Sequence, residues 1–598
     1  MKLISNLLKP TYRNRNFLIL SIIAYLISIN IVHNDPHFTY RWLAFFFNML
    51  SLGIIFFLYV SQTATKNHFK KLFSEKEINP IIVILTITIV ANFLLLSIYP
   101  YVSISDELRD GGMFAMKIAS GVLKNIFGYG SYDAHGLIIP TLAVPFYYLF
   151  GNSTLAFRFP AALLATGDVL LLYILVRLVV NRSAAFWSAL VLATLPLHMF
   201  FAHTQIVIAF NLFWVPVLLL ALWHLLKRHR NMDYIFFGTL LGFVCGFHAA
   251  IRVFACVTFF VFVFLEFREM IKQKLIIEEG FVTFFTRVLL VLCFAVIGFG
   301  PRLLFTGPQD FFHTSRFIFE SNMQANQALT LYNFATLKAN YLRSLMVYFY
   351  EPTSFFYPVD KPILPPFLAI FFFVGLGYAA FVLRKTFLTI TLSLLIILPF
   401  FTSAITDWIN ADHRASPLFA IASVFVGVGI SYILSIIKNN TWRNIATAWI
   451  LLYLGTQVLT FYTLQPANEK WKMRDYLSMH IIYFLQHDKK YQASPAEGLH
   501  YLQYPATRTP ACVFVSPANY DYLSNNFGIL EQQYFLLPKA IIQFAVNPEM
   551  YNNSATVVPG QCPDTVPSNK NMHVYTISCT ENRSVCPLGD NGNIVLHY

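Results

Sequence analysis

A dense group of charged side chains follows directly behind a long apolar segment. Residues 103–112 read SISDELRDGG, and the apolar segment before them covers residues 81–101. A carboxylate fixed at the end of a membrane helix is placed to accept a proton from a hydroxyl group, or to bind an amine or metal that positions one. We therefore predict that Asp106 and Glu107 form part of a catalytic site. The alternative is structural, with Asp106 capping the next helix and Asp110 near its positive end.

The composition around this site is that of a polytopic membrane protein. The chain has 598 residues, of which 57% are hydrophobic and only 12% charged, whereas soluble domains carry about twice that share of charge. The net charge of +13 does not indicate nucleic-acid binding, because the basic residues lie in short turns between apolar runs, where they orient helices.

Windows of apolar residues long enough to cross a bilayer predict about thirteen transmembrane helices in an all-α fold. One further window, 136–150, is short and contains Pro140 and Pro145, so we expect it to be re-entrant or interfacial. With this assignment every second loop is basic, which predicts a cytoplasmic location for these loops and for the N-terminus.

The predicted organisation has three parts. Residues 1–80 form a cytoplasmic tail with two additional helices, residues 81–464 form the membrane core, and residues 465–598 form a C-terminal domain. The core contains two exoplasmic loops, 101–157 and 306–362, that are too long for mere connections. The cytoplasmic loops are short, and the sequence contains no phosphate-binding or dinucleotide-binding motif. We therefore expect the chemistry on the exoplasmic side.

An odd number of spans places the C-terminal domain on the exoplasmic side. Its runs ACVFVS, HVYTIS and NIVLHY predict strands of a small α/β or β-rich module. Four cysteines in an exported domain predict two disulfides of unknown pairing, and a zinc site is the alternative, although no CxxC pair is present. These cysteines are Cys512, Cys562, Cys579 and Cys586.

The stretch that begins at Asp106 resembles the first exoplasmic loop of polyprenyl-phosphate-dependent glycosyltransferases with the GT-C architecture. That family includes protein O-mannosyltransferases and lipid A aminoarabinose transferases. Its loop starts with an acidic pair, continues with an amphipathic helix along the membrane and a glycine-aromatic segment, and closes with LFG and an Arg-x-Pro helix start. The matching elements here are Asp106–Glu107, Gly112–Lys124, Tyr129–Tyr132, Leu149–Gly151 and Arg158–Pro160.

The resemblance covers roughly residues 80–465. Near its end the family shows an HxRY-like motif, and DHRASPLF (412–419) matches it in His413 and Arg414 but lacks the tyrosine. Aminoarabinose transferases carry Glu-Lys-Pro where this chain has Asp133-Ala134-His135-Gly136. Their lysine is therefore missing, and His135 is the candidate to replace it.

The resemblance implies transfer of a sugar from a polyprenyl-phosphate-linked donor to an exoplasmic acceptor, with inversion and with Asp106 as the base. The departing lipid phosphate needs cations, and a divalent metal is left open as a cofactor. The candidate phosphate-binding residues are Arg109, His135, Arg316, His413 and Arg414. The candidate substrate-binding residues are Tyr132, Asp133 and Arg158.

Other features have competing interpretations. Asp168 lies inside an apolar span, and we interpret it as a buried contact to a helix end or a neighbour of Arg177. His198 and His203 are weak metal-ligand candidates without a third ligand. A transporter or flippase of a lipid-linked substrate is the alternative function, but the sequence shows no internal repeat. An inactive scaffold is a third possibility. The bacterial inner membrane is the expected location, or the endoplasmic reticulum in a eukaryote.

Overall fold

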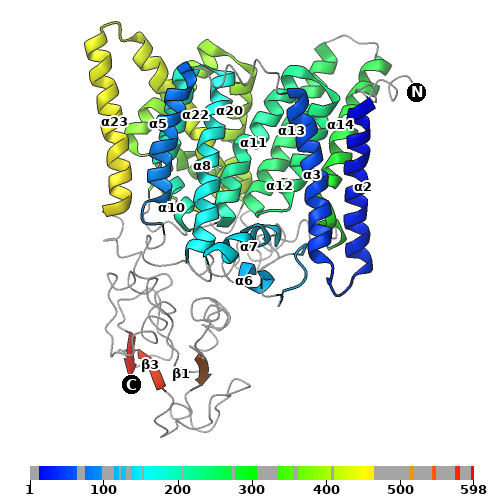
Figure 1. Cartoon of the computed structure of the whole chain (residues 1–598). Helices are drawn as coiled ribbons and strands as arrows, with labels where there is room; N and C mark the ends of the chain where they lie inside the picture. The colour runs from blue at the N-terminus through cyan, green and yellow to red at the C-terminus, as the bar shows by residue number, and fades with distance from the viewer. Residues whose placement is uncertain are drawn as a thin grey trace.

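The computed structural model describes most of the membrane core. The described residues are 12–63, 75–96, 114–119, 121, 123–128, 136–150, 154–204, 206–272, 277–305, 334–353, 361–405 and 410–463, together with four strands near the C-terminus. Long helices run side by side as a bundle, and shorter helices lie at one end of it (Figure 1). Helices satisfy their own backbone hydrogen bonds, as a lipid environment requires.

Ten helices in the described part of the chain are long and apolar enough to cross a membrane, or eleven if one bent pair is a single span. The bent pair is α9 (Arg182–Thr194) and α10 (Pro196–Thr204), which meet at 57°. The ten helices are α2 (Tyr12–Asn34), α3 (Arg41–Thr63), α8 (Thr154–Val179), α11 (Ile206–Arg228), α13 (Ala249–Lys272), α14 (Ile277–Phe299) with η3 (Gly300–Leu304), α19 (Pro366–Gly377) with η5 (Tyr378–Leu383), α20 (Thr386–Pro399) with η6 (Phe400–Ala404), α22 (Pro417–Ile436) and α23 (Asn440–Thr463).

The predicted count of about thirteen spans is higher than this. The two other predicted spans correspond to α5 (Glu75–Phe93) and α12 (Asn231–Cys245), whose apolar parts are shorter than a full span. Both helices nevertheless lie among the long helices in Figure 1. Their apolar composition signals a membrane environment, but it does not fix where a helix starts and ends.

The short window with two prolines behaves as expected. It forms α7 (Ile138–Phe150), which has only 13 residues and contains Pro145. Figure 1 shows α7 at one end of the bundle, next to α6 (Phe114–Ala119), rather than running through it. The predicted amphipathic helix over 112–124 is thus shorter than the sequence suggested, since only α6 is helical among its described residues.

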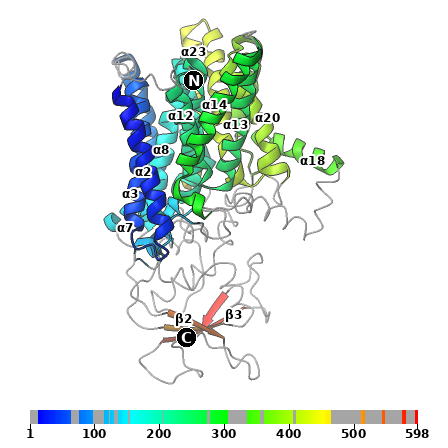
Figure 2. The same ribbon diagram turned by 90° about the vertical axis from the view of Figure 1, so that its right-hand side faces the viewer.

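The second long loop contributes a helix that leaves the bundle. This is α18 (Phe334–Leu345), followed by η4 (Met346–Tyr348), and Figure 2 shows α18 projecting sideways. Tyr341 on α18 donates a hydrogen bond to the Ile396 carbonyl (2.8 Å), and its partial burial raises the pKa of the phenol. Phe334 and Leu342 remain exposed, as in a helix that lies at a membrane interface.

Four strands are described in the C-terminal segment. They are β1 (Ala511–Val515), β2 (Ile542–Val546), β3 (His573–Cys579) and β4 (Ile594–His597), in the order β2-β1-β3-β4. Strand β1 is parallel to β2 and β3, and β3 is antiparallel to β4. All three predicted strand runs are therefore strands, and β2 is an additional one.

The predicted disulfides find no support so far. Cys562 and Cys586 lie outside the described residues, and Cys512 and Cys579 are described only as strand backbone. The cysteines whose side chains are described, Cys245, Cys256 and Cys293, are all free thiols. The pairing stays a prediction.

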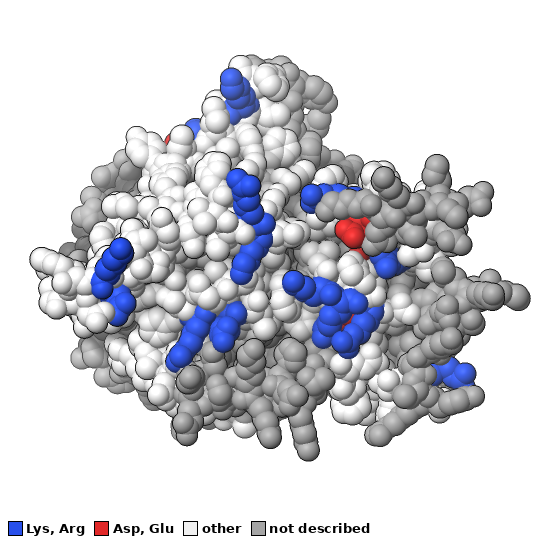
Figure 3. Space-filling view, turned by 90° about the horizontal axis from the view of Figure 1, so that it is seen from above, with Lys and Arg blue, Asp and Glu red and all other residues white. Residues whose placement is uncertain are grey.

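The turns that the sequence predicted to be basic lie together at one end of the bundle. We call the end with the α11–α12 and α22–α23 turns the basic face, and the end with α6, α7 and α21 (Asp412–Ala415) the loop face. Figure 3 shows Lys and Arg side chains scattered over the basic face and few Asp or Glu side chains. The alternation of basic turns predicted from the sequence is thus reproduced by the antiparallel course of the helices.

Glycines allow a close contact between α12 and α14. Gly238 and Gly242 on α12 face α14, where a Cβ at Gly242 would overlap the Ala295 carbonyl. Gly298 on α14 faces back, and a Cβ there would overlap the Thr239 carbonyl. Small residues spaced four apart let two membrane helices approach until their backbones touch. This contact fixes α12 against α14. The end of α12 leads into α13, which carries part of the candidate site.

Candidate active site and lipid groove

Most of the residues predicted to do chemistry lie outside the described part of the chain. These are Asp106, Glu107, Arg109, Tyr132, Asp133, His135 and Arg316. The roles assigned to them stay predictions. Of the predicted phosphate and substrate ligands, the structure places Arg158, His413 and Arg414.

Arg158 is fully buried near the start of α8. Its Nη1 donates to the Leu96 carbonyl at 3.3 Å, which ties the loop-face end of α8 to the segment after α5. The predicted contact of Arg158 with substrate stays a prediction.

His413 belongs to a polar cluster at the loop face. His413 lies on α21 and is 8% exposed, with its Nδ1 3.4 Å from the Asp412 carboxylate. Its ring faces that of His248 at 5.8 Å between centroids. Ser416 Oγ donates to the His413 carbonyl at 2.7 Å, which closes the turn between α21 and α22. Arg414 lies on the same turn and is half-buried.

His248 is oriented by two donors to the same ring nitrogen. Asn211 Nδ2 on α11 lies 3.0 Å from His248 Nδ1, and the Ala250 N–H also donates to that nitrogen at 3.1 Å. A nitrogen that accepts twice carries no proton, so the neutral ring carries its proton on Nε2. Asn211 also approaches Ser416 Oγ at 3.5 Å, which links α11 to α22. We call Asn211, His248, Arg252, Asp412, His413 and Ser416 the loop-face cluster.

Arg252 lies one helical turn after His248, in the first turn of α13. It is 6% exposed, and its Nε and Nη2 donate to the carbonyls of Cys245 and Phe247 at 3.0 and 3.3 Å. Cys245 ends α12 and Phe247 lies in the turn that follows, so the short α12–α13 turn holds the guanidinium in place. Sequence reasoning missed Arg252 and His248, although GFHAAIR places both in the turn between two apolar runs.

Arg252 lies at one end of an apolar groove between α13 and α20. The groove has a volume of about 850 Å³. The residues of α13 that line it run from Arg252 to Arg268, which at 1.5 Å per residue is about 24 Å of helix. We call it the lipid groove, because most of its lining between the arginines at its two ends is apolar and its mouth carries exposed aromatic side chains. Those side chains are Phe260, Phe264 and Phe401.

Asp168 and His198 make a second buried pair, deep in the bundle. Asp168 Oδ2 lies 3.3 Å from His198 Nε2, and both side chains are completely buried. Asp168 is on α8, and His198 is in the first turn of α10, just beyond the break at Pro196. The sequence led us to expect a helix end or Arg177 as the neighbour of Asp168, and the structure provides a helix end.

His198 and His203 do not converge on one point. His203 Nε2 lies 3.1 Å from both the Ala91 carbonyl and the Tyr462 hydroxyl, whereas His198 contacts Asp168. Within the described ranges, no group of three His, Cys, Asp or Glu side chains is arranged to hold a metal ion. The two histidines therefore act as separate links between helices in this structure.

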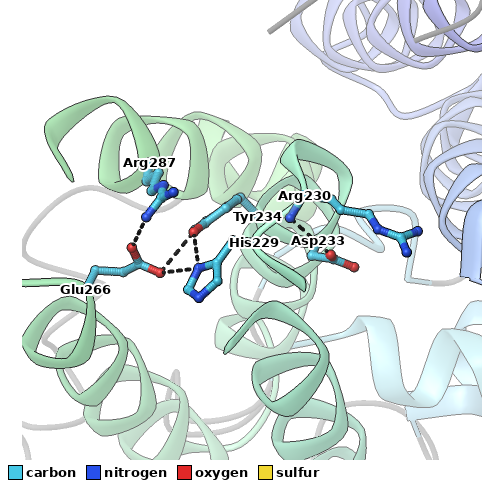
Figure 4. Close-up of polar contacts among 6 residues, drawn as sticks. All are labelled: His229, Arg230, Asp233, Tyr234, Glu266 and Arg287. Carbon is cyan, nitrogen blue, oxygen red and sulfur yellow. Dashed lines mark hydrogen bonds and ion pairs between the residues drawn. The ribbon is translucent and has the colours of Figure 1, made fainter. Parts of the chain in front are cut away.

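An ionic cluster at the basic face was not expected from the sequence. Figure 4 shows Glu266 of α13 at its centre. Glu266 accepts from Arg287 at 2.7 Å and from the Tyr234 hydroxyl at 2.9 Å, and His229 Nδ1 lies 3.3 Å away. An acidic residue in an otherwise apolar span was the available signal. The cluster joins α12, α13 and α14 at one end of the bundle.

Residues 134–295 match the dolichyl-phosphate-mannose-protein mannosyltransferase family. The matched segment contains α7 to α13 and most of α14, and with them Asn211, His248 and Arg252 of the loop-face cluster. The resemblance to GT-C glycosyltransferases that the sequence predicted is confirmed. No curated protein sequence matches the chain.

Two solved structures are similar to the chain in fold. One is the oligosaccharyltransferase AglB from Archaeoglobus fulgidus, in complex with an inhibitory peptide and a dolichol-phosphate (13% identity, TM-score 0.40, 77% of this chain and 64% of that chain). The other is ArnT from Cupriavidus metallidurans bound to undecaprenyl phosphate (12% identity, TM-score 0.44, 78% of this chain and 85% of that chain). The chain thus spans a little less than two thirds of the archaeal protein it matches.

Proposed function

We propose that this protein is an integral membrane glycosyltransferase that moves a sugar from a polyprenyl-phosphate-linked donor to an acceptor at the loop face. The observation that carries the proposal is the lipid groove, which leads along α13 to Arg252 and the loop-face cluster. The family match of residues 134–295 supports the reaction class. It does not favour the transporter alternative.

The groove suits the hydrocarbon part of such a donor. An isoprenoid chain lying between α13 and α20 would replace lipid tails against the aromatic mouth and lose no hydrogen bonds there. Its phosphate would then lie at the loop-face end, beside Arg252 and close to His248. Arginine pairs with phosphate oxygens through two parallel hydrogen bonds, which fixes orientation as well as charge.

The same end of the groove supplies what the leaving group needs. The bond between the sugar and the lipid phosphate breaks with negative charge developing on the phosphate, and pre-positioned cations stabilise that charge. Among the described residues, the cations that stabilise the phosphate would be Arg252, His413 and Arg414. Arg109, His135 and Arg316 are further candidates from the loops, by their predicted roles.

The acceptor hydroxyl needs a base on the opposite side of the sugar. Asp106 is our candidate for an inverting displacement, with Glu107 beside it. Tyr132, Asp133 and Arg158 would border the acceptor or the sugar.

The proposal includes an orientation in the membrane. Basic turns face the cytoplasm in most membrane proteins, so the basic face would be cytoplasmic and the loop face exoplasmic. The C-terminal segment 465–598, with its four strands, would then form an exoplasmic domain. A bacterial inner membrane is the expected location, or the endoplasmic reticulum in a eukaryotic host.

The test compares surface glycans and glycoproteins by mass spectrometry in strains that differ only in this gene. The strains lack the gene, or carry the native protein, Asp106→Asn, Arg252→Gln or the control Arg443→Gln, at equal membrane levels. Arg443 is an exposed cation at the start of α23 and lies far from the groove along the chain. Loss of one sugar on deletion, restored by the native protein and by Arg443→Gln but not by Arg252→Gln, is the expected result. An unchanged glycan profile on deletion would refute the transferase, and full activity of Asp106→Asn would refute only its role as base.

A further inference from the structure

A second pocket opens at the basic face, at the opposite end of the lipid groove. It has a volume of about 560 Å³ and is bordered by the end of α8, the end of α11, the last turns of α13 and the turn between η5 and α20. Four basic side chains border this pocket, which we call the basic pocket. They are Lys227, Arg268, Arg384 and Lys385.

The positive charge of the basic pocket is not cancelled by its carboxylates. Of the two carboxylates that border it, Glu266 already accepts from Arg287 and Tyr234 and lies beside His229 (Figure 4). Four cations thus border the pocket against two carboxylates. The pocket therefore attracts an anion.

The pocket also holds its cations in position. Lys385 Nζ donates to the carbonyls of Val179 (2.7 Å) and Val180 (3.4 Å) at the end of α8. Arg384 ends η5 in a left-handed conformation (φ 46°), with its Nε on the Phe381 carbonyl at 3.0 Å. Within the described part of the chain, the Nη groups of Arg384 and the guanidinium of Arg268 make no hydrogen bond or ion pair. Two guanidinium groups at the rim are thus available to a ligand.

The basic pocket is continuous with the lipid groove. Both are bordered by Leu265, Arg268, Arg384 and Thr386. A ligand held by the cations therefore has an apolar channel directly beside its head. Exposed aromatic side chains form the outer edge of that channel, including Phe264 on α13 at 64% exposure.

We propose that the basic pocket binds the headgroup of an anionic phospholipid from the adjacent leaflet, with one acyl chain in the lipid groove. A soluble anion would use the pocket alone, whereas a phospholipid accounts for both the charge and the adjoining apolar channel. This site is distinct from the proposed donor site, whose phosphate end lies about 24 Å away along α13. The two lipids would compete for the middle of the groove. The inference does not rest on the proposed function, since it concerns only the opposite end.

The experiment measures lipid binding to the full-length protein by native mass spectrometry, after delipidation in detergent. The probes are dioleoyl phosphatidylglycerol, dioleoyl phosphatidylcholine and glycerol phosphate, which is the anionic head without chains. We expect the native protein to prefer phosphatidylglycerol over phosphatidylcholine by on the order of tenfold or more, because each Lys or Arg near an anionic headgroup adds to the attraction. Glycerol phosphate should compete only weakly.

Three sets of variants locate the site. Arg268→Gln with Arg384→Gln should remove the preference for phosphatidylglycerol. Lys438→Gln with Arg443→Gln, which removes the same charge elsewhere on the basic face, should keep it. Ser393→Trp, which fills the groove between α13 and α20, should weaken binding of the two-chain lipid without changing competition by glycerol phosphate.

Each of the opposite results overturns the proposal. These are equal binding of the two phospholipids, a preference that survives loss of Arg268 and Arg384, and glycerol phosphate competing as well as the intact lipid. Unchanged binding in Ser393→Trp would remove the groove from the site. If the double arginine variant fails to elute as a folded monodisperse protein, the exposed Lys227→Gln provides the same test with one charge.

Discussion

Replacing Glu266 by glutamine should destabilise the bundle more than its small change in shape suggests. The carboxylate is almost fully buried and accepts from two donors on two other helices, Arg287 of α14 and Tyr234 of α12. A glutamine of the same size has one acceptor oxygen and no charge. It therefore loses one of these bonds and leaves the guanidinium without its counter-ion.

The structure sets the expected size of the effect. A hydrogen bond to a charged group contributes about 1.5–3 kcal/mol, and breaking a buried ion pair costs about 3–5 kcal/mol. The Arg287 side chain is 29% exposed, so water stabilises part of its stranded charge. We therefore expect Glu266→Gln to lower the free energy of unfolding by about 2–3 kcal/mol.

The assay is reversible unfolding of the purified protein in mixed micelles with increasing SDS. Glu351→Gln is the matched control, because Glu351 pairs with Arg343, whose side chain is 54% exposed. An exposed ion pair contributes about 1 kcal/mol or less, so the control should change little. A Glu266→Gln variant as stable as Glu351→Gln would show that the cluster in Figure 4 does not hold the three helices together. A double-mutant cycle with Arg287→Gln should also give a coupling of about 0.5–3 kcal/mol.

Three further predictions follow from other contacts. Gly242→Ala should destabilise the bundle by about 1–3 kcal/mol through overpacking, because the added Cβ meets the α14 backbone. The control Gly53→Ala in α3, where the space around the added Cβ is open, should be neutral or stabilising. Equal unfolding midpoints of the two variants in SDS would disprove the close contact. Asp168→Ala should lower the free energy of unfolding by about 1–3 kcal/mol, because it leaves His198 without its partner. Asp168→Asn, whose amide can donate to His198 Nε2, should lower it less. The reverse order of the two variants in the same unfolding assay would contradict this pairing. The Tyr40 N–H, 2.7 Å from Asp35, lowers the pKa of that carboxyl below 3.8. The small contribution of the Asp35 carboxylate to stability is therefore present above that pH and is lost as pH falls through the lowered pKa. The difference in melting temperature between the native protein and Asp35→Ala should shrink at low pH, and a difference that grows there would refute the assignment.

Much of the fold was readable from the sequence alone, because the bilayer imposes a simple rule on it. A helix in lipid needs a long apolar run, and basic turns mark one face, so the order of the helices and the ends that carry charge follow from the printed residues. Short sequence patterns also predicted local structure correctly. Two prolines in a short window predicted that α7 would not span the membrane, and strand-like runs predicted β1, β3 and β4. His413 was singled out because its motif lies in a loop, where polar residues stand out, and its predicted role in binding phosphate stays a prediction.

What only the tertiary structure decided is which helices face one another. The lipid groove is made by α13 and α20, more than 100 residues apart in the chain, and no periodicity links them, since lipid-facing and helix-facing positions are equally apolar. The same holds for Glu266, whose charge is balanced by Arg287 and whose second oxygen accepts from Tyr234, both on other helices. His248 and Arg252 were missed because a polar residue in an apolar segment has no recognisable partner until the helices are packed.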